Sequence, residues 1–126
     1  MKIVIETIPH EDQRYPTVGD WQWYSDGNLS IKVSNLSDWR REALIAVHEL
    51  VEVLMCKQDG VTEQSVDEFD KNYEANRHPD NFDEPGDDPS APYVKQHCVA
   101  TGIERILAAN LGVNWKEYEE ELDKLP

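Results

Sequence analysis

Hydrophobic and polar residues alternate in the first part of the chain with the two-residue period of β-strands. Residues 2–8 (KIVIETI) predict one strand, which Pro9 ends. The polar segment 10–20 then predicts a loop. In segment 21–33 (WQWYSDGNLSIKV), aromatic strand formers precede a Ser-Asp-Gly-Asn turn and alternating apolar residues follow it, so this segment predicts a hairpin. We therefore expect a small antiparallel sheet of about three strands in a β-rich part, residues 1–36.

From about Ser37 the spacing of apolar residues changes to the period of an α-helix. Asn35 or Ser37 is a suitable N-cap for the first helix, Gly60 ends it, and Thr62 is a suitable N-cap for the second. The chain is thus predicted to be an α+β protein, with about three to four helices after the sheet. The expected helices span residues 37–59, 63–77, 93–111 and 114–125, the third ended by Gly112 and the last opened by Asn114 with Glu117.

Residues 78–92 (HPDNFDEPGDDPSAP) contain four prolines and five acidic residues, which predict a long, mobile loop. The density of carboxylates would suit calcium, but the segment lacks the spaced ligands and the closing glutamate of an EF-hand loop. A solvated linker is therefore the better interpretation. The chain has no internal repeat and no linker with a domain on each side, so residues 1–126 are expected to form a single domain.

The first expected helix carries three polar residues in an otherwise apolar stretch, residues 44–56 (LIAVHELVEVLMC). His48 and Glu52 are four residues apart and lie on one face, and Glu49 lies beside them. Burying a carboxylate without a partner costs several kcal/mol, so these groups require a cation, a proton or water. A metal ion would supply the cation; alternatively, this side of the helix faces water and basic residues screen the charges. The expected apolar stripe of the same helix consists of Leu44, Val47, Val51, Leu54 and Met55.

The third expected helix also carries a histidine and a glutamate on one face. His97 and Glu104 are two turns apart, and their neighbours are small residues that would allow another helix to approach closely. His48, Glu52, His97 and Glu104 could therefore meet across a helix pair, as ligands for zinc first, or for manganese or iron. The alternative for His97 is a hydrogen-bonded histidine at the edge of the core. The apolar stripe expected on this helix consists of Val99, Ala100, Ile103, Ile106 and Leu107.

Four other residues could add a ligand or an orienting group to this metal site. Asp67 and Asp70 on the second helix could supply a carboxylate or orient a histidine, and Asp70, which follows Phe69, is expected nearer the core. Cys56 and Cys98 are far apart and form no C-x-x-C pair, so free, buried thiols with a packing role are expected.

The segment HELVE resembles the H-E-x-x-H signature of the zinc proteases. On that resemblance His48 would be a metal ligand and Glu49 the general base that acts on a metal-bound water. Glu52 stands where the family has its second histidine, which keeps a ligand but changes the charge of the site. The resemblance implies a zincin-like arrangement, with a small sheet before the motif helix, and a peptide substrate.

The wider sequence is similar to a group of small uncharacterised phage and prophage proteins. The shared features are HELVE, Phe69-Asp70, the segment EPGDDPSAPY, and His97 followed by Ile103-Glu104. This resemblance covers about two-thirds of the chain and implies no established activity.

The strongly negative net charge of the chain disfavours some classes of binding partner. The chain has 26 acidic residues against 12 lysines and arginines, a formal charge of -14, which disfavours direct binding to nucleic acid. No stretch is long and apolar enough for a membrane span, and the N-terminus, with Lys2 and Glu6, does not resemble a signal peptide. We expect a cytoplasmic protein whose partner is a protein or peptide. The oligomeric state is open.

Three functions are consistent with these features. The leading hypothesis is a metal-dependent hydrolase in which Glu49 activates water. A second is an acidic phage protein that imitates DNA and occupies a host DNA-binding protein. The third, a magnesium-dependent nucleotide pyrophosphohydrolase, rests on the Glu49-x-x-Glu52 and Asp67-x-x-Asp70 spacing, but that family is all-α and magnesium does not favour histidine.

Overall fold

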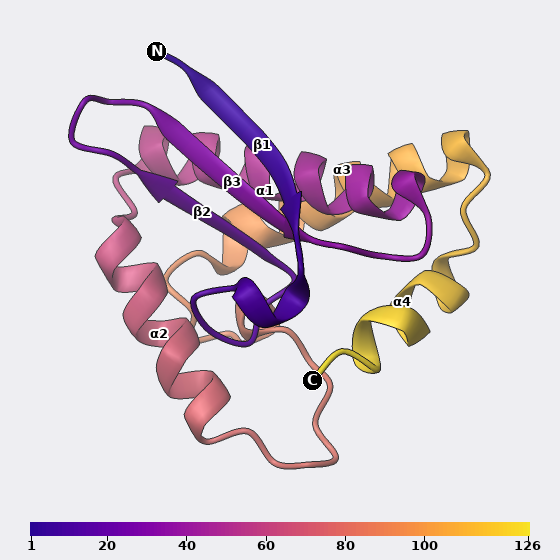
Figure 1. The fold of residues 1–126 in the computed structure, drawn as a ribbon. Helices are drawn as coiled ribbons and strands as arrows, with labels where there is room; N and C mark the ends of the chain where they lie inside the picture. The colour runs from indigo at the N-terminus through magenta and orange to yellow at the C-terminus, as the bar shows by residue number, and fades with distance from the viewer.

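Three strands near the N-terminus form the only sheet of the computed structural model, which describes residues 1–126 (Figure 1). The strands are β1 (Ile3–Ile8), β2 (Gly19–Trp23) and β3 (Leu29–Ser34), and their order in the sheet is β1-β3-β2. The predicted hairpin is confirmed, because β2 and β3 pair antiparallel.

The prediction of a wholly antiparallel sheet is wrong. Strand β1 runs parallel to β3, with Ile3 opposite Leu29 and Ile8 opposite Ser34, so the sheet is mixed. Alternation along a strand predicts neither its direction nor its neighbour. Strand β3 is largely buried, and the hairpin satisfies the backbone hydrogen bonds of only one of its edges. The connection formed by residues 9–18 lets β1 satisfy the other edge.

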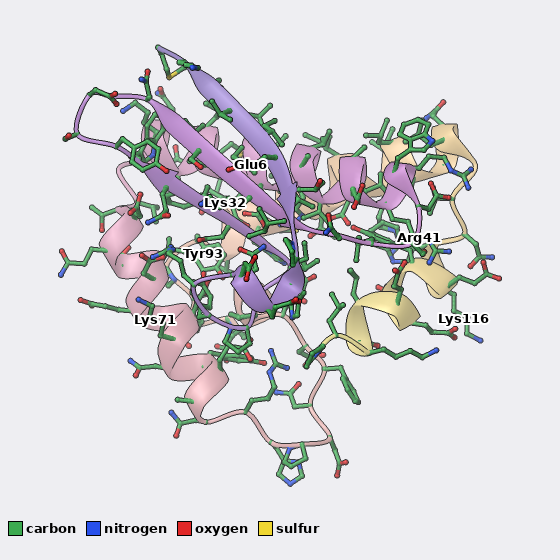
Figure 2. The ribbon with its side chains drawn as sticks, in the orientation of Figure 1. Glu6, Lys32, Arg41, Lys71, Tyr93 and Lys116 are labelled. Atoms are coloured by element: carbon green, nitrogen blue, oxygen red, sulfur yellow. The ribbon has the colours of Figure 1, made fainter.

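The two faces of the sheet have different surroundings. Leu29, Ile31 and Val33 alternate along β3 and belong to the hydrophobic core, on the side that helix α1 (Trp39–Asp59) covers. On the opposite face Glu6 and Lys32 are register partners on neighbouring strands (Figure 2), and Glu6 is exposed whereas Lys32 is half-buried. One helix layer therefore covers only one side of the sheet, and the candidate site lies within that layer.

Four helices follow the sheet, as predicted: α1, α2 (Glu63–Ala75), α3 (Val94–Leu111) and α4 (Trp115–Asp123). The side chains of Thr62 and Asn114 cap α2 and α4, and Gly60 ends α1 in the left-handed conformation, as the sequence predicts. The N-cap of α1 is Asp38, which accepts a hydrogen bond from the Arg40 amide, and not Asn35 or Ser37. None of the helices combines the length and the hydrophobicity that a transmembrane span requires.

The most buried side of α1 is the side that carries its polar residues. The expected apolar stripe is only partly covered, and its Leu54 is 42% exposed. Helix α1 lies between the sheet and α3, so the side facing both neighbours is covered whatever its polarity. The hypothesis that the polar side faces water is therefore wrong. The buried residues of α1 are Leu44, Ile45, His48, Glu49, Glu52, Val53 and Cys56.

In helix α3, as in α1, the side that carries the polar residues is more buried than the expected apolar stripe. Its buried positions include Ala100 and Ala108, whose small side chains let α1 and α3 pack closely, as expected. The expected apolar stripe is instead partly exposed: Val99 is 38%, Ile103 39% and Ile106 65% accessible. The α1–α3 contact thus encloses the histidines and glutamates.

The loop 78–92 is only in part the solvated linker that its composition predicts. A single 3-10 turn, η2 (Pro85–Asp87), packs against α2 and α3, and Gly86 within it is buried. The tip of the loop, with Phe82 61% exposed, faces solvent. The turn brings acidic residues to the helix pair.

Candidate metal centre

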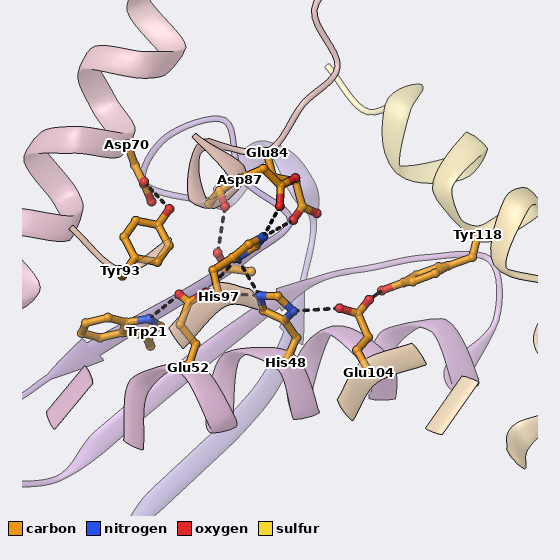
Figure 3. A network of polar contacts seen from close by, with 12 residues as sticks. Trp21, His48, Glu52, Asp70, Glu84, Asp87, Tyr93, His97, Glu104 and Tyr118 are labelled. Atoms are coloured by element: carbon orange, nitrogen blue, oxygen red, sulfur yellow. Dashed lines mark hydrogen bonds and ion pairs between the residues drawn. The ribbon is translucent and has the colours of Figure 1, made fainter. Parts of the chain in front are cut away.

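Three ligand atoms from α1 and α3 converge in the interior. The Nε2 atom of His48 lies 3.2 Å from Oε2 of Glu52 and 3.1 Å from Nδ1 of His97, and that Nδ1 lies 3.1 Å from the same glutamate oxygen. Figure 3 shows the three side chains pointing toward one another, and all three are buried. His48 and Glu52 share a face because they are one helical turn apart, and α3 delivers His97 from across the helix contact.

Glu104, expected as a fourth ligand, lies on the other side of the His48 ring. Its Oε1 is 2.7 Å from Nδ1 of His48, and its Oε2 accepts a hydrogen bond of 2.7 Å from the Tyr118 hydroxyl. Both oxygens of Glu104 are thus engaged away from the three converging atoms. A carboxylate at Nδ1 holds a proton on that nitrogen, so Nε2 is the nitrogen that becomes available to a metal ion when the ring gives up its second proton.

Glu52 is held on its other side by the sheet. The indole Nε1 of Trp21 in β2 donates to Oε1 of Glu52 over 3.2 Å, so Oε2 is directed to the two histidines. Burial by itself raises the pKa of Glu52, but the hydrogen bonds from His48 and His97 outweigh it and lower that pKa to about 2. Glu52 is therefore a carboxylate throughout the neutral range.

The two imidazoles hold protons strongly when no other cation is near. Burial lowers the pKa of each ring, but the carboxylates of Glu104 and Glu52 raise the pKa of His48 to about 11, and those of Glu52 and Glu84 raise that of His97 to about 10. Two imidazolium rings would then have their centroids 4.7 Å apart. At an effective dielectric constant of about 20 that repulsion is roughly 3.5 kcal/mol.

Glu49 is buried beside this group, and its carboxylate makes no hydrogen bond or ion pair. It packs against Gly19 of β2, where a Cβ atom would lie 2.5 Å from Oε1 of Glu49. Burial and the neighbouring Glu52 raise the pKa of Glu49 well above its ordinary value. An uncompensated acid with a high proton affinity has the character of a general base.

The second nitrogen of His97 faces the acidic loop. Oε2 of Glu84 lies 2.8 Å and Oδ1 of Asp87 3.2 Å from His97 Nε2. Neither oxygen lies in the direction that a hydrogen bond from the ring requires, and Nε2 has no hydrogen-bond partner.

The remaining candidate residues lie near the site without joining the three atoms. Asp70 is buried, as expected, and accepts hydrogen bonds from the hydroxyls of Tyr93 and Tyr15; burial raises its pKa to about 7. Asp67 forms an ion pair of 3.2 Å with Arg14. The spacing of a nucleotide pyrophosphohydrolase is therefore present in the sequence, but its four acids do not form one group.

The two cysteines are free, as expected, but they differ in exposure. Cys56 is buried in the core, and burial raises its thiol pKa to about 12, which favours a packing role. Cys98 is exposed, contrary to the prediction, because it lies on the outer side of α3 next to Val99.

A cavity of about 530 Å³ opens onto the converging atoms. Twelve of its lining residues are aspartate or glutamate, against one arginine and three histidines. Its walls therefore favour cations and positively charged groups over phosphates and other anions.

The converging atoms have the spacing of ligands on one metal ion. Zinc binds imidazole nitrogen and carboxylate oxygen at about 2.0–2.2 Å, so tetrahedral ligands lie roughly 3.3–3.6 Å apart and neighbouring octahedral ligands roughly 2.8–3.1 Å apart. The separations of 3.1–3.2 Å extend from the upper end of the octahedral range to just below the tetrahedral range. His48, Glu52 and His97 could therefore hold a metal ion.

No protein family, curated protein or solved structure matches this chain. The similarity to zinc proteases and to small phage proteins accordingly stays a prediction based on motifs. What the structure adds is the buried His/Glu/His group itself.

Sequence reasoning missed several contributors to the site. The sequence predicts only a strand at Trp21 and a helix at Tyr118, and no local pattern connects these residues to the glutamates that they bind. The composition around Glu84 and Asp87 predicts a solvated linker, whereas both side chains lie beside His97. The Pro-Gly turn between these acids was the one available signal, because a glycine permits close approach of a backbone to a ring.

Proposed function

We propose that the protein binds a divalent metal ion, zinc in the first place, through His48, Glu52 and His97, and that it is a metal-dependent hydrolase. The observation that carries the proposal is the convergence of three buried ligand atoms within 3.2 Å of one another. A cation there replaces the protons of two adjacent imidazoles and removes their mutual repulsion.

The surroundings support a metal ion over shared protons. Glu104 holds the Nδ1 proton of His48 and leaves Nε2 free, which is the outer contact that metal-binding histidines commonly have. Trp21 orients Glu52 in the same manner. Three protein ligands leave coordination positions open toward the cavity, as in catalytic rather than structural sites.

Glu49 supports the hydrolase part of the proposal. It is adjacent to His48, lines the same cavity, and has no partner of its own. A bound metal ion lowers the pKa of a coordinated water, and a carboxylate with a raised pKa then accepts its proton. Peptides are the proposed substrates on the resemblance to H-E-x-x-H enzymes, and the acidic cavity favours peptides with basic residues.

The first experiment measures metal content by plasma mass spectrometry in tag-free protein. We expect bound zinc, manganese or iron in the wild type, retention in His78→Ala, and loss in His48→Ala. His78 is a suitable control because its side chain is 73% exposed and lies in the loop, away from α1. A wild type that contains no metal, and takes up none on titration, would overturn the proposal and leave a proton-sharing cluster.

The second experiment separates binding from catalysis. Glu49→Gln should retain the metal content of the wild type and lose hydrolysis of a library of short basic peptides. Equal peptide hydrolysis in wild type and Glu49→Gln would refute the role of Glu49.

A further inference from the structure

The His97 ring is buried, and one of its nitrogens, Nε2, lies close to two carboxylates without a hydrogen bond to either. The residue is 5% exposed, and Nδ1 belongs to the group described above, whereas Nε2 makes no hydrogen bond. Leaving a buried polar group unpaired costs about 1–3 kcal/mol. The ring is nevertheless held in this position, so a partner for Nε2 is to be sought among its neighbours.

Two carboxylates are close to Nε2 but lie off its axis. The oxygens of Glu84 and Asp87 are 2.8 Å and 3.2 Å away, and the three atoms lie within 4.8 Å of one another. A hydrogen bond would place an acceptor along the N–H direction. A metal ion would occupy that direction itself, so that its other ligands lie to either side. Short distances combined with poor hydrogen-bond direction therefore suit an ion better than a proton.

The loop is built to bring these carboxylates to the ring. Gly86 packs directly on His97, where a Cβ atom would lie 2.4 Å from Cγ of the ring. The turn η2 contacts both α2 and α3. Glu84 and Asp87 flank this contact, and Figure 3 shows both side chains on the far side of the ring from His48. Their positions thus follow from a packed turn and not from a free linker.

We propose that Nε2 of His97, Glu84 and Asp87 hold a second divalent cation, joined to the first through the His97 ring. The proposal rests on the proposed function for its first ion. The Glu84 and Asp87 side chains are 46% and 56% exposed, so the second ion is open to solvent and exchanges more readily than the first. Two carboxylates and one imidazole suit zinc or manganese.

The second ion would replace a proton on the His97 ring. With the first ion on Nδ1, the ring keeps one proton, on Nε2. Binding of the second ion breaks that N–H bond, forms a nitrogen–metal bond, and releases the proton to solvent, which leaves the ring as an imidazolate shared by two ions. The first ion assists, because a bound cation lowers the pKa of the remaining N–H group.

The test is zinc stoichiometry after equilibrium dialysis of the full chain. We expect about two equivalents in the wild type, about one in the double variant Glu84→Gln/Asp87→Asn, and about one in Glu52→Gln. The control Asp80→Asn removes a charge from the same loop, where the Asp80 side chain is 93% exposed, and should keep about two. All three loop residues are exposed, so these variants do not endanger folding.

The outcomes distinguish the two proposals. A single equivalent that Glu52→Gln loses and the loop double variant keeps would overturn the second site and leave the first. A single equivalent lost only in the loop double variant would support the second site and overturn the first. No bound zinc in the wild type would overturn both.

A second measurement tests the shared ring. Two Cu²⁺ ions on one imidazolate couple their spins, so we expect the electron paramagnetic resonance signal per bound copper to be weaker in the wild type than in Glu84→Gln/Asp87→Asn. Equal signals per copper, with two ions bound in the wild type, would show that His97 does not join the sites.

Discussion

The substitution Glu104→Gln tests whether the metal ligand His48 is oriented by the hydrogen bond that its other ring nitrogen makes, on the side away from the metal site. Glu104 accepts from both the His48 ring and the Tyr118 hydroxyl, over 2.7 Å each. Glutamine has the same shape, but it has one acceptor oxygen and one amide donor and carries no charge. If its amide faces His48, the proton of the ring must move to Nε2, which blocks that nitrogen as a ligand. If its oxygen faces His48, the ring keeps a weaker, neutral partner.

The expected loss follows from the strength of that contact. Hydrogen bonds to charged groups contribute about 1.5–3 kcal/mol. Outer partners of metal-binding histidines are typically responsible for about 10- to 100-fold in metal affinity, which corresponds to roughly 1.4–2.7 kcal/mol. We therefore expect zinc to bind Glu104→Gln about 10- to 100-fold more weakly than the wild type. Tyr118→Phe leaves the charge of Glu104 in place, so its loss of affinity should be smaller.

Competition with a chromophoric chelator measures these affinities. Glu117→Gln provides the matched control, because the Glu117 side chain is 67% exposed and its nearest ion pair, with Arg41, is 3.9 Å long. The unfolding temperature of each metal-free variant reports general damage to the fold. If Glu104→Gln binds zinc within about threefold of the wild type, the outer contact does not control the ligand and the reasoning fails.

Two further predictions concern the loop and pH. Gly86→Ala should weaken metal binding, because the new Cβ atom would meet the His97 ring. Gly102→Ala is the control, because its Cβ atom would lie in open space on α3 and should leave metal binding unchanged. Dialysis against zinc compares the two variants, and equal affinities would contradict the close packing of Gly86 on His97. In the metal-free protein the pKa values of His48 and His97 are raised to about 11 and 10, so protonation of the two rings stabilises the folded state. This contribution is complete below about pH 6.5, the ordinary pKa of histidine, and it is lost as the pH rises toward the raised values. Urea denaturation with chelator present should therefore show a free energy of unfolding that falls between about pH 6.5 and 10, and a flat or rising profile would refute the assignment.

Most of the local structure could be predicted from the sequence, because it depends on short-range geometry. The alternation in segment 21–33 led to the correct hairpin, and the caps at Thr62 and Asn114 follow from which side chains can accept backbone hydrogen bonds. His48 and Glu52 had to share a face of their helix, since residues four apart do. Two of the three candidate ligands therefore lie within one helical turn and could be paired from the sequence.

The burial of each helix face could not be predicted in the same way. On hydrophobicity alone, the stripe that contains Leu54 should be the buried face of α1, and the stripe that contains Ile106 the buried face of α3. Both residues are instead substantially exposed. The structure buries His48 and His97 instead. The small residues of α3 indicated where the two helices would approach, but the hydrophobic pattern by itself pointed to another side.

Local patterns were enough to predict the strands, the helices and the placement of a histidine and a glutamate on one face of each of two helices, because backbone periodicity sets which residues share a face. Tertiary packing accounts for the parallel pairing of β1 and for the approach of Trp21, Tyr118 and the acidic loop to the helix pair. These contacts join segments far apart in the chain, and they depend on how the elements pack. Local motifs therefore supply the ligand residues of the site, whereas the protonation of those residues and the distances between their atoms depend on the assembled fold.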